Sequence, residues 1–367
     1  MAFRLLVCIS AHGFGHLAMT APILNRLSRL YDVKLILRTK LPEPLIRELI
    51  SVEVDVISET SDFGMVMKNA FEVDLDESYK RYSALHYDWD KQVEKEMNRL
   101  GQLDPDLILS NAPYLTLAAA GKLHIPCLGY CSLNWADIFQ SYFGCDSSEA
   151  KKIIHEMRAA YNMADFFISP EPSMPMDWVS KLIDIGPVAR IGKHMKAEIC
   201  KRLAIVDTAR LVLVTPGGFE TNVPVNDWPQ IENIHWIVSW NHFSERSDIS
   251  GVKDIGLIFN DILASCDAVI TKPGYGTVAD TVCNNIPALY VCRGDWAEEK
   301  FLVNWWEKKG NVVQISKEQF FQGDVVRPLE KLWSRPALEK IAPSGIDELV
   351  SIISSYLPNK FEFSTQR

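Results

Sequence analysis

Short apolar runs alternate with segments of helical periodicity along the first half of the chain. The runs contain few polar residues, which is typical of parallel strands that are covered on both faces. The segments between them repeat apolar residues at three- and four-residue spacing, which indicates helices. We therefore expect a parallel sheet with helices on both sides. The predicted strands are Phe3–Ser10, Val33–Leu37, Val52–Ile57, Leu107–Leu109 and Cys127–Tyr130, and the predicted helices are Leu17–Leu30, Glu43–Ile50, 78–101 and Leu115–Leu123.

The alternation restarts after Ile185-Gly186-Pro187, where proline ends a strand because it has no amide hydrogen for a sheet ladder. The predicted fold class is α/β, with two Rossmann-like domains in tandem and a C-terminal helix that crosses back to the first domain. We expect an N-terminal domain at 1–190, a C-terminal domain at 191–335, and a final segment at 336–367 with this helix, at about 336–357, and a frayed tail. The strands predicted for the second domain are Leu211–Thr215, Trp236–Ser239, Ala268–Thr271, Ala288–Cys292 and Val312–Gln314, with helices at 257–265, 276–284, 298–309 and 324–333.

The composition narrows the classes of partner. The 367 residues carry 47 Asp and Glu against 38 Lys and Arg, a net charge of −9, which argues against a nucleic acid partner. No uninterrupted apolar run approaches the roughly 20 residues that span a bilayer, and nothing indicates contact with a membrane surface. The eight cysteines are scattered without a CxxC pair. This favours buried thiols in a cytoplasmic protein over disulfides or a zinc site.

The first candidate site directly follows the first predicted strand, at Ala11-His12-Gly13-Phe14-Gly15-His16. Glycines such as Gly15 let the backbone approach a ligand, and the helix that begins here offers N–H groups to it. His16 would face the crevice where α/β proteins bind ligands. A neutral imidazole there suits a general base, although a histidine that caps its own helix is the alternative. The motif is not GxGxxG, so a dinucleotide site is not favoured.

The second candidate site repeats this layout at residues 270–280, after a later strand. The amides of Gly276 and Thr277, with the Thr277 hydroxyl, are placed to bind a diphosphate, and Gly274 keeps the turn open. Lys272 would neutralise phosphate charge. Asp280, one turn further along, would accept two hydrogen bonds from a ribose diol. The alternatives are an ordinary tight turn, a solvated lysine and a surface aspartate.

Two further loops follow strands of the second domain. Gly217 and Gly218 allow the close backbone approach that a phosphate needs, and they would face the 274–277 turn. Glu298 and Glu299 lie near the start of the helix at 298–309 and would bind sugar hydroxyls. Acids in the first turn of a helix can instead merely complement the helix dipole.

The order of these motifs resembles that of glycosyltransferases with the GT-B fold. The 274–280 segment, Gly-Tyr-Gly-Thr-Val-Ala-Asp, looks like the donor-binding motif of the nucleotide-sugar-dependent branch. Together with His12–His16, Asn134–Phe139 and Arg293–Phe301 it is similar to the glycosyltransferase-like N-terminal module of arabinose kinases and their bacterial relatives. The resemblance covers nearly the whole chain. It implies UDP-sugar binding in the C-terminal half and acceptor binding in the N-terminal half.

The chain departs from the resembled families at two positions. Many of these glycosyltransferases have Glu where this chain has Asp280, which shortens the reach to a ribose by one methylene. In many of them the base histidine has an aspartate partner from the strand corresponding to Leu107–Ser110. The nearby residue here is Asn111, which can orient the imidazole of His16 but cannot stabilise its charged form. After residue 357 no room remains for a kinase domain, so sugar kinase activity is not implied.

The resulting hypothesis is a metal-independent glycosyltransferase, of the hexosyl- or acetylhexosaminyl-transferase class, in which His16, oriented by Asn111, deprotonates an acceptor hydroxyl. The partners would be a nucleotide sugar, with UDP preferred, and a small-molecule, lipid or glycan acceptor. Trp135 and Phe139 would form the acceptor wall. The Asp104-Pro105-Asp106 sequence fits a loop before a strand better than a metal site, and no cofactor is expected. Two alternatives stay open: a non-catalytic nucleotide-sugar binding or regulatory protein, and a UDP-sugar 2-epimerase on the same fold.

Overall fold

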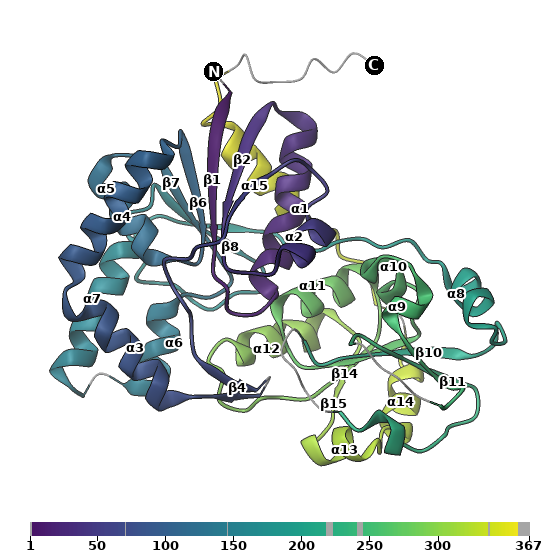
Figure 1. The fold of residues 1–367 in the computed structure, drawn as a ribbon. Coiled ribbons are helices and arrows are strands. Elements are labelled where there is room, and N and C mark those ends of the chain that lie inside the picture. Colours follow the sequence, from purple (N-terminus) through teal and green to yellow (C-terminus); the bar gives the residue numbers. More distant parts are fainter. Residues whose placement is uncertain are drawn as a thin grey trace. The chain divides into compact units, whose positions relative to one another are not determined.

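The chain forms two compact units in the computed structural model (Figure 1). Unit 1 consists of residues 1–188 and 344–367, and unit 2 of residues 189–343. Both units are built around a fully parallel sheet, which confirms the predicted α/β class with two Rossmann-like halves in tandem. In the part of the chain that is described, no helix has the length and apolar character needed to cross a membrane. The described residues are 2–69, 71–144, 146–217, 223–240, 245–336 and 338–358.

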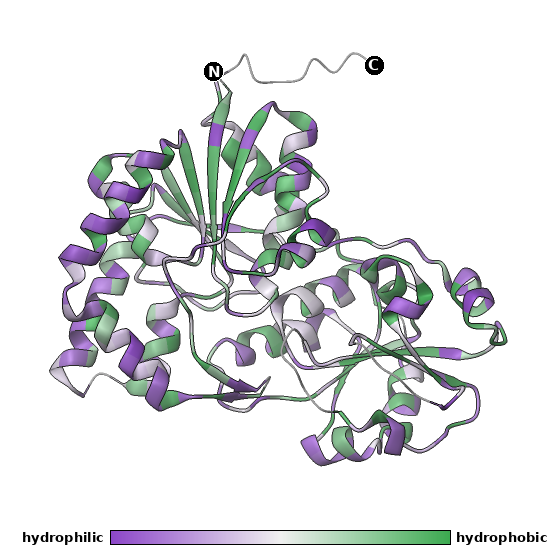
Figure 2. Cartoon of the chain, in the orientation of Figure 1, coloured by the Kyte–Doolittle hydropathy of each residue, from purple (hydrophilic) through white to green (hydrophobic). Residues whose placement is uncertain are grey.

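Unit 1 contains a seven-stranded sheet in the order β3-β2-β1-β6-β7-β8-β9. The first strand of the chain lies near the middle, because β1 pairs on one side with β2 and on the other with β6. The central strands β1, β6 and β7 are almost entirely buried and strongly hydrophobic (Figure 2). The strands are β1 (Phe3–Ile9), β2 (Val33–Arg38), β3 (Asp55–Ile57), β6 (Leu107–Asn111), β7 (Cys127–Tyr130), β8 (Phe166–Pro170) and β9 (Leu182–Ile185), with a separate antiparallel pair, β4 (Met67–Asn69) and β5 (Glu72–Val73).

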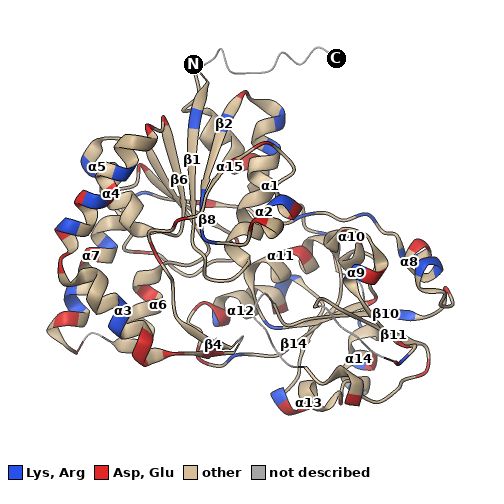
Figure 3. Cartoon of the chain, viewed as in Figure 1, with Lys and Arg blue, Asp and Glu red and all other residues tan. Residues whose placement is uncertain are grey.

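Two groups of helices pack against this sheet. One group is α1, α2 and α15, and the other includes α4, α5, α6 and α7 (Figure 1). Their outer faces carry mixed charges, which Figure 3 shows along α4 and α7. This two-sided cover explains why the strands read as continuous apolar runs in the sequence. The helices are α1 (Gly15–Leu30), α2 (Glu43–Leu49), α3 (Leu75–Tyr87), α4 (Trp89–Leu103), α5 (Tyr114–Leu123), α6 (Trp135–Phe143), α7 (Ser148–Tyr161) and α15 (Gly345–Ser354).

The single long helix that we predicted at 78–101 is wrong, because this region forms two helices, α3 and α4. The backbone leaves helical geometry at Asp88, where φ is −127° and ψ is 65°. The break lets the Trp89 ring stack on His86, with 4.8 Å between the ring centroids. No glycine or proline marks this position, so the sequence pattern gave no signal for it.

The C-terminal helix α15 packs on α1 and on β9. It begins later than we predicted, at Gly345, because Pro336 and Pro343 precede it and proline disfavours a helix at the residue before it. The Gly345 amide donates to the carbonyl of Pro187 over 3.2 Å. The two places where the chain passes between the units, 188–189 and 343–344, therefore adjoin each other on the unit 1 side.

Unit 2 contains a six-stranded sheet in the order β12-β11-β10-β13-β14-β15. Its first strand, β10, again lies inside the sheet, between β11 and β13. The strands are β10 (Arg210–Thr215), β11 (Ile234–Val238), β12 (Ile249–Gly251), β13 (Ala268–Thr271), β14 (Ala288–Tyr290) and β15 (Val312–Gln314). The helices are α8 (Lys196–Leu203), α9 (Val252–Ile255), α10 (Phe259–Leu263), α11 (Tyr275–Asn284), α12 (Glu299–Lys309), α13 (Lys317–Gln322) and α14 (Val326–Trp333), with a 3₁₀ turn at Val225–Asp227.

Candidate functional site

Each sheet has one point where the strand order reverses, and the predicted site residues follow the strands at these two points. In unit 1 the reversal lies between β1 and β6, whose carboxyl ends are Ile9 and Asn111. In unit 2 it lies between β10 and β13, which end at Thr215 and Thr271. Chains that leave such strands toward opposite sides open a crevice, which is where α/β folds bind ligands. Both units therefore offer a ligand site at the carboxyl edge of their sheet.

The structure brings His16 and Asn111 together at the unit 1 reversal point. The His16 Nδ1 atom lies 2.9 Å from Asn111 Oδ1. Asn111 Nδ2 donates to Thr20 Oγ1 over 2.9 Å, and the Thr20 hydroxyl donates to the His16 carbonyl over 2.8 Å. Because the only hydroxyl hydrogen of Thr20 is used in this way, its oxygen accepts from Asn111, and the amide oxygen must face His16. His16 Nδ1 therefore carries the hydrogen, and Nε2 holds the lone pair that a base needs.

Burial keeps His16 neutral. The side chain is 6% exposed, and burial lowers its pKa to about 4, although the hydrogen bond with Asn111 works in the opposite direction. The Cys131 thiol lies 3.7 Å from His16 Nδ1. An uncharged amide is a poorer partner than a carboxylate for the imidazolium that forms when a histidine takes up a proton. The arrangement thus supplies a fixed tautomer without a directly bonded negative charge.

Our prediction that Trp135 and Phe139 form an acceptor wall is wrong, because both side chains are fully buried. Phe139 packs into an aromatic cluster with Tyr82. Trp135 instead lies beside both motif histidines, with its ring 5.2 Å from that of His12 and 5.7 Å from that of His16. Trp135 therefore fixes the positions of the imidazoles from inside the unit.

Sequence reasoning missed Asp62, which the fold places next to this cluster. Its Oδ2 atom accepts a hydrogen bond from Trp135 Nε1 over 2.8 Å, and its side chain is buried. Burial raises the pKa of Asp62 to about 6, against the lowering effect of the hydrogen bond from Trp135. The residue lies in the long connection between β3 and β4, where no motif marks it. Thr20 could have been found, because it lies one helical turn after His16 on the same face.

In unit 2 the structure brings Gly217 and Lys272 together at the reversal point. Gly217 has a φ of +104°, which favours glycine, and a Cβ at this position would lie 2.8 Å from Lys272 Cε. Lys272 directly follows β13, whose last residue, Thr271, donates from its hydroxyl to the Thr215 carbonyl. The lysine side chain therefore lies against the bare backbone of the first loop. The predicted partner glycine, Gly218, lies outside the described residues.

The surroundings of Lys272 disfavour its charge. Burial and the positive charge of Arg293 lower the pKa of Lys272 to about 7, against the opposing effect of Glu299 and Glu298. In the described part of the chain, no hydrogen bond or ion pair joins the Lys272 amine to another residue. The guanidinium of Arg293 lies 4.6 Å from the centroid of the Trp296 ring. Arg293 is paired with Glu299 over 3.6 Å, so an anion bound here would pair with Lys272.

The helix α11 begins beside Lys272 and points its amino end at the same place. Its N-cap is Gly274, which has no side chain that could cap the helix, and its first turn holds no acidic residue. A Cβ on Gly274 would have no neighbour within 4 Å, so the backbone here is open. Gly276 and Thr277 lie in this first turn, where N–H groups have no partner within the helix. The N-terminus of this helix can therefore bind an anion.

The three predicted carboxylates of unit 2 are buried and already hold hydrogen bonds. Asp280 accepts from the Arg190 amide over 2.8 Å and from Asn260 Nδ2 over 3.1 Å, and burial raises its pKa. Glu299 accepts from the amides of Arg293 and Gly294 over 2.9 and 3.1 Å. Glu299 therefore holds the loop before α12.

Glu298 accepts from Trp296 Nε1 over 3.0 Å and lies at the N-cap position of α12. Gly15, on the unit 1 side, is the first residue of α1, and a Cβ there would have no neighbour within 4 Å. A sugar or ribose at Asp280 or Glu298 would have to share or replace hydrogen bonds that these carboxylates already accept. Among the described residues, no group of three or more His, Cys, Asp or Glu side chains is placed to hold a metal ion.

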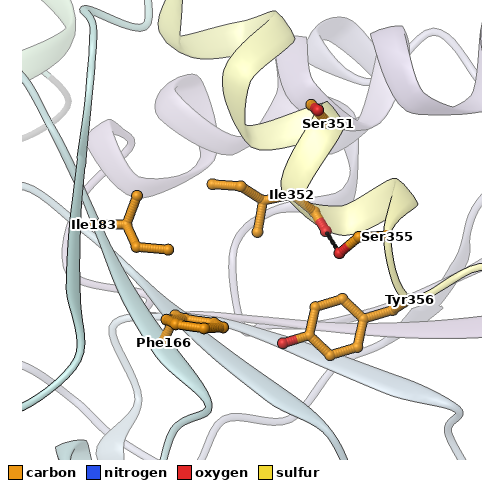
Figure 4. Close-up of a pocket in the computed structure, with 6 residues that line it drawn as sticks. All are labelled: Phe166, Ile183, Ser351, Ile352, Ser355 and Tyr356. Atoms are coloured by element: carbon orange, nitrogen blue, oxygen red, sulfur yellow. Dashed lines mark hydrogen bonds between the residues drawn. The ribbon is translucent and has the colours of Figure 1, made fainter.

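A hollow of about 400 Å³ lies elsewhere in unit 1, where α15 covers β8 and β9 (Figure 4). Phe166 begins β8, and Ile183 is the second residue of β9. The hollow is therefore near the amino ends of these strands, whereas His16 and Asn111 lie at carboxyl ends. Its lining offers mainly apolar surface and hydroxyl groups, from Phe166, Ile183, Ser351, Ile352, Ser355 and Tyr356.

Solved structures of similar fold identify the architecture. CalG4, the calicheamicin glycosyltransferase, superposes with a TM-score of 0.65 at 12% identity, covering 97% of this chain and 98% of that one. The glycosyltransferase VinC in complex with dTDP gives 0.55 at 13%, covering 96% and 95%. A putative UDP-N-acetylglucosamine 2-epimerase from Listeria monocytogenes gives 0.55 at 12%, covering 99% of both chains. The chain thus has the GT-B fold of glycosyltransferases.

The sequence also resembles a particular protein. It is 24% identical over 347 residues to L-arabinokinase of Arabidopsis thaliana. The alignment covers 90% of this chain and 32% of the relative, so the chain spans about a third of the length of that protein. This similarity supports the expected relationship to the glycosyltransferase-like module of arabinose kinases. No family model matches the chain.

Proposed function

We propose that the chain is a glycosyltransferase that moves a sugar from a UDP-sugar to an acceptor hydroxyl. The observation that carries this proposal is the arrangement at the unit 2 reversal point. There the bare backbone of Gly217, the half-buried amine of Lys272 and the uncapped start of α11 lie around one place. Each of these features favours an anion, and together they fit a diphosphate.

The donor would be held entirely by unit 2. Its diphosphate would accept hydrogen bonds from the amides of Gly276 and Thr277 and from Lys272, with the loop of Gly217 and Gly218 beside it. Positive charge and helix N–H groups can offset the charge that grows on a departing diphosphate, so the proposal needs no metal ion. The ribose would take one of the hydrogen bonds at Asp280, and the sugar would reach Glu298 rather than the loop-bound Glu299.

The acceptor hydroxyl would lose its proton to Nε2 of His16. The hydrogen bonds of Asn111 and Thr20 support this role, since they fix the tautomer in which Nε2 holds the lone pair. The proposed acceptor is a small molecule, lipid or glycan, and the proposed reaction class is hexosyl or acetylhexosaminyl transfer. The fold of CalG4 and VinC, both named as glycosyltransferases, supports the reaction type.

A second candidate is a nucleotide-sugar binding protein without transfer activity. Two observations favour it: the pKa of His16 falls to about 4, and its partner is an amide. A base with so low a pKa removes protons inefficiently at neutral pH. Tight UDP-sugar binding without turnover over a broad acceptor panel would favour this candidate. Slow hydrolysis of UDP-sugars would favour the transferase, and an isomerised nucleotide sugar would indicate a 2-epimerase.

Calorimetry with UDP, GDP and dTDP tests the donor site. We expect UDP to bind most tightly, and binding of none of the three would contradict both candidates. A matched pair of variants locates the site: Lys272→Ala should weaken UDP binding, whereas Lys253→Ala, on the exposed face of α9, should not. Turnover of UDP-glucose that survives in His16→Ala would contradict the base assignment alone.

A further inference from the structure

A buried carboxylate lies beside the histidine cluster of unit 1 without a role in the function proposed above. Asp62 is 6% exposed, and its carboxylate accepts hydrogen bonds from Trp135 Nε1 and from the Thr60 hydroxyl. Burying a carboxylate costs free energy unless its charge is compensated. These hydrogen bonds and the positive charge of Arg38 offset part of the cost, and the imidazoles of His12 and His16 lie against the same Trp135 ring.

The connection between β3 and β4 closes tightly over the histidines. Gly64 has a φ of +64°, and a Cβ at this position would lie 2.7 Å from His12 Cβ and 2.8 Å from the Trp135 ring. One residue further, the Met65 carbonyl lies 3.0 Å from His12 Nδ1. Asp62, Gly64 and Met65 thus contact His12 and Trp135 through three successive interactions. The position of Asp62 is fixed relative to the cluster by this packing.

Trp135 contacts Asp62 on one side and both imidazoles on the other. The indole N–H contacts the Asp62 carboxylate, while the ring lies against His16 and His12. The indole is held at its backbone too, because the Trp135 amide donates to Tyr161 Oη over 3.1 Å. An aromatic ring in a dry interior contributes little dielectric response, so the carboxylate acts on the imidazoles at an effective dielectric far below that of water.

We propose that Asp62 supplies the negative charge that stabilises the protonated form of His16, in place of the carboxylate that Asn111 does not provide. This inference rests on the proposed function, in which His16 takes up a proton from the acceptor. Asp62 is a positioning residue in this account, since it acts through the field across Trp135 and touches no reacting atom. The chain therefore separates two tasks: Asn111 fixes the tautomer, and Asp62 stabilises the charge.

Other ionisable groups also face Asp62, and they define its background field. Arg38 at the end of β2 is the positive charge among them, and it is paired with Glu96 through two hydrogen bonds. The remaining groups are neutral at pH 7, because burial raises the pKa of each of these side chains. They are Cys8 on β1, Tyr82 on α3, Tyr114 on α5 and Tyr161 on α7. Arg38 is shared with Glu96 and therefore offsets only part of the Asp62 charge.

The test is the titration of His16 by NMR, with long-range ¹H–¹⁵N spectra of the full chain between pH 7.5 and 4. His16→Gln assigns the signal. Because burial raises the pKa of Asp62 to about 6, the carboxylate loses its charge near that pH while His16 is still neutral. The ring signals of His16 should therefore show a step near pH 6 in the wild type, and this step should be absent in Asp62→Asn. The matched control is Asp55→Asn, an exposed carboxylate in β3 that pairs with Lys34 and should leave the step unchanged. A step that persists in Asp62→Asn overturns the proposal.

A second measurement covers the case in which Asp62→Asn does not fold. In the wild type, the Trp135 indole N–H signal should shift as Asp62 titrates, and the ring signals of His16 should show a step at the same midpoint. A His16 curve without this step overturns the proposal. Neither measurement uses a nucleotide or a sugar, so their failure leaves the proposed donor site untouched. Conversely, failure of UDP binding in calorimetry removes the proposed function without affecting the coupling between Asp62 and His16.

Discussion

The two sheet-reversal points differ in how they are filled. In unit 1 the point is occupied by interlocked side chains, because His16, Asn111 and Thr20 form a closed set of hydrogen bonds. In unit 2 it is left open by glycine, and Gly217 has no side chain where Lys272 lies. The same topology thus produces a pre-set chemical group in one unit and a cradle for a ligand in the other. Topology places a site, and the residues at the strand ends decide its kind.

The largest effect should come from filling the cradle. Gly217→Ala puts a Cβ within 2.8 Å of Lys272 Cε, so the lysine side chain has to move. We expect UDP affinity to fall on the order of 100-fold, about 2.7 kcal/mol, measured by calorimetry. Gly294→Ala is the matched control. Alanine at its φ of +102° would be equally strained, but its Cβ would meet nothing within 4 Å. Equal losses in the two variants would show that strain, and not displacement of Lys272, is responsible.

Removing the amine should have a smaller effect than displacing it into the site. We expect Lys272→Ala to weaken UDP binding by roughly 10- to 50-fold, the value of one charge-assisted hydrogen bond. Melting curves with and without UDP give a second readout, since ligand that binds only the folded state raises Tm. An unchanged affinity would mean that the helix N-terminus alone holds the anion.

The pH dependence of UDP binding should report the charge of Lys272 in unit 2. Because the pKa of Lys272 is lowered to about 7, the amine loses its charge as the pH rises through this value. We therefore expect the affinity to be constant below pH 7 and to fall by up to about tenfold per pH unit above it. Calorimetry at pH 6.5, 7.5 and 8.5 measures this. Lys272→Arg should abolish the dependence, because a guanidinium stays charged, and a dependence that persists would place its origin elsewhere.

Replacing Asn111, the amide partner of His16, should change the properties of unit 1 alone. In Asn111→Asp a carboxylate faces His16 Nδ1, so we expect the pKa of His16 to rise from about 4 by at least about one unit. UDP affinity should stay within about twofold, since Asn111 does not contribute to the cradle. NMR titration and calorimetry on the same sample check both statements. A change in UDP affinity would show that the two reversal points are not independent.

The last effect concerns the stability of the fold in acid. Burial lowers the pKa of His16 to about 4 and that of His86 to about 3, both below the ordinary value of 6.5. The unfolded chain therefore binds more protons than the folded chain between these values, and stability falls as the pH drops below 6.5. Each histidine contributes up to about 1.4 kcal/mol per pH unit, partly offset by Asp62, which gains a proton on folding below about pH 6. Urea unfolding at pH 7 and pH 5 measures the difference, and equal stability would contradict it.

The parts of the molecule that sequence could predict are those set by local pattern. The strands follow from their apolar runs. The meeting of His16 with Asn111 was expected from the resemblance to glycosyltransferases, and it agrees with strand ends that lie side by side in a parallel sheet. The environment of the unit 2 carboxylates could not be predicted, because their partners are backbone amides. Asp280 and Glu299 each bind an N–H group whose direction depends on how a loop turns. Periodicity carries no information on such turns. The sequence therefore suggested carboxylates that are available to a ligand, whereas in the structure they accept hydrogen bonds from the protein.

The contact between Asp62 and Trp135 could not be predicted from the sequence either. Asp62 reaches Trp135 only because the connection from β3 packs against His12 and Trp135, and Gly64 permits the close approach. A long irregular connection has no period from which contacts can be inferred. Unit 1 is therefore the part that most needs a structure, since its loops and not its strands define the surroundings of the histidines.

The hydrogen bond between the Pro187 carbonyl and the Gly345 amide has a consequence for how the molecule can be taken apart. The whole of unit 2 is an insertion in the chain of unit 1, and both ends of that insertion leave from adjacent residues. A linker of a few residues should therefore be able to replace residues 189–343 and leave a continuous unit 1. In evolutionary terms, a chain built in this way can exchange unit 2 as one genetic segment while the histidine cluster of unit 1 stays unchanged.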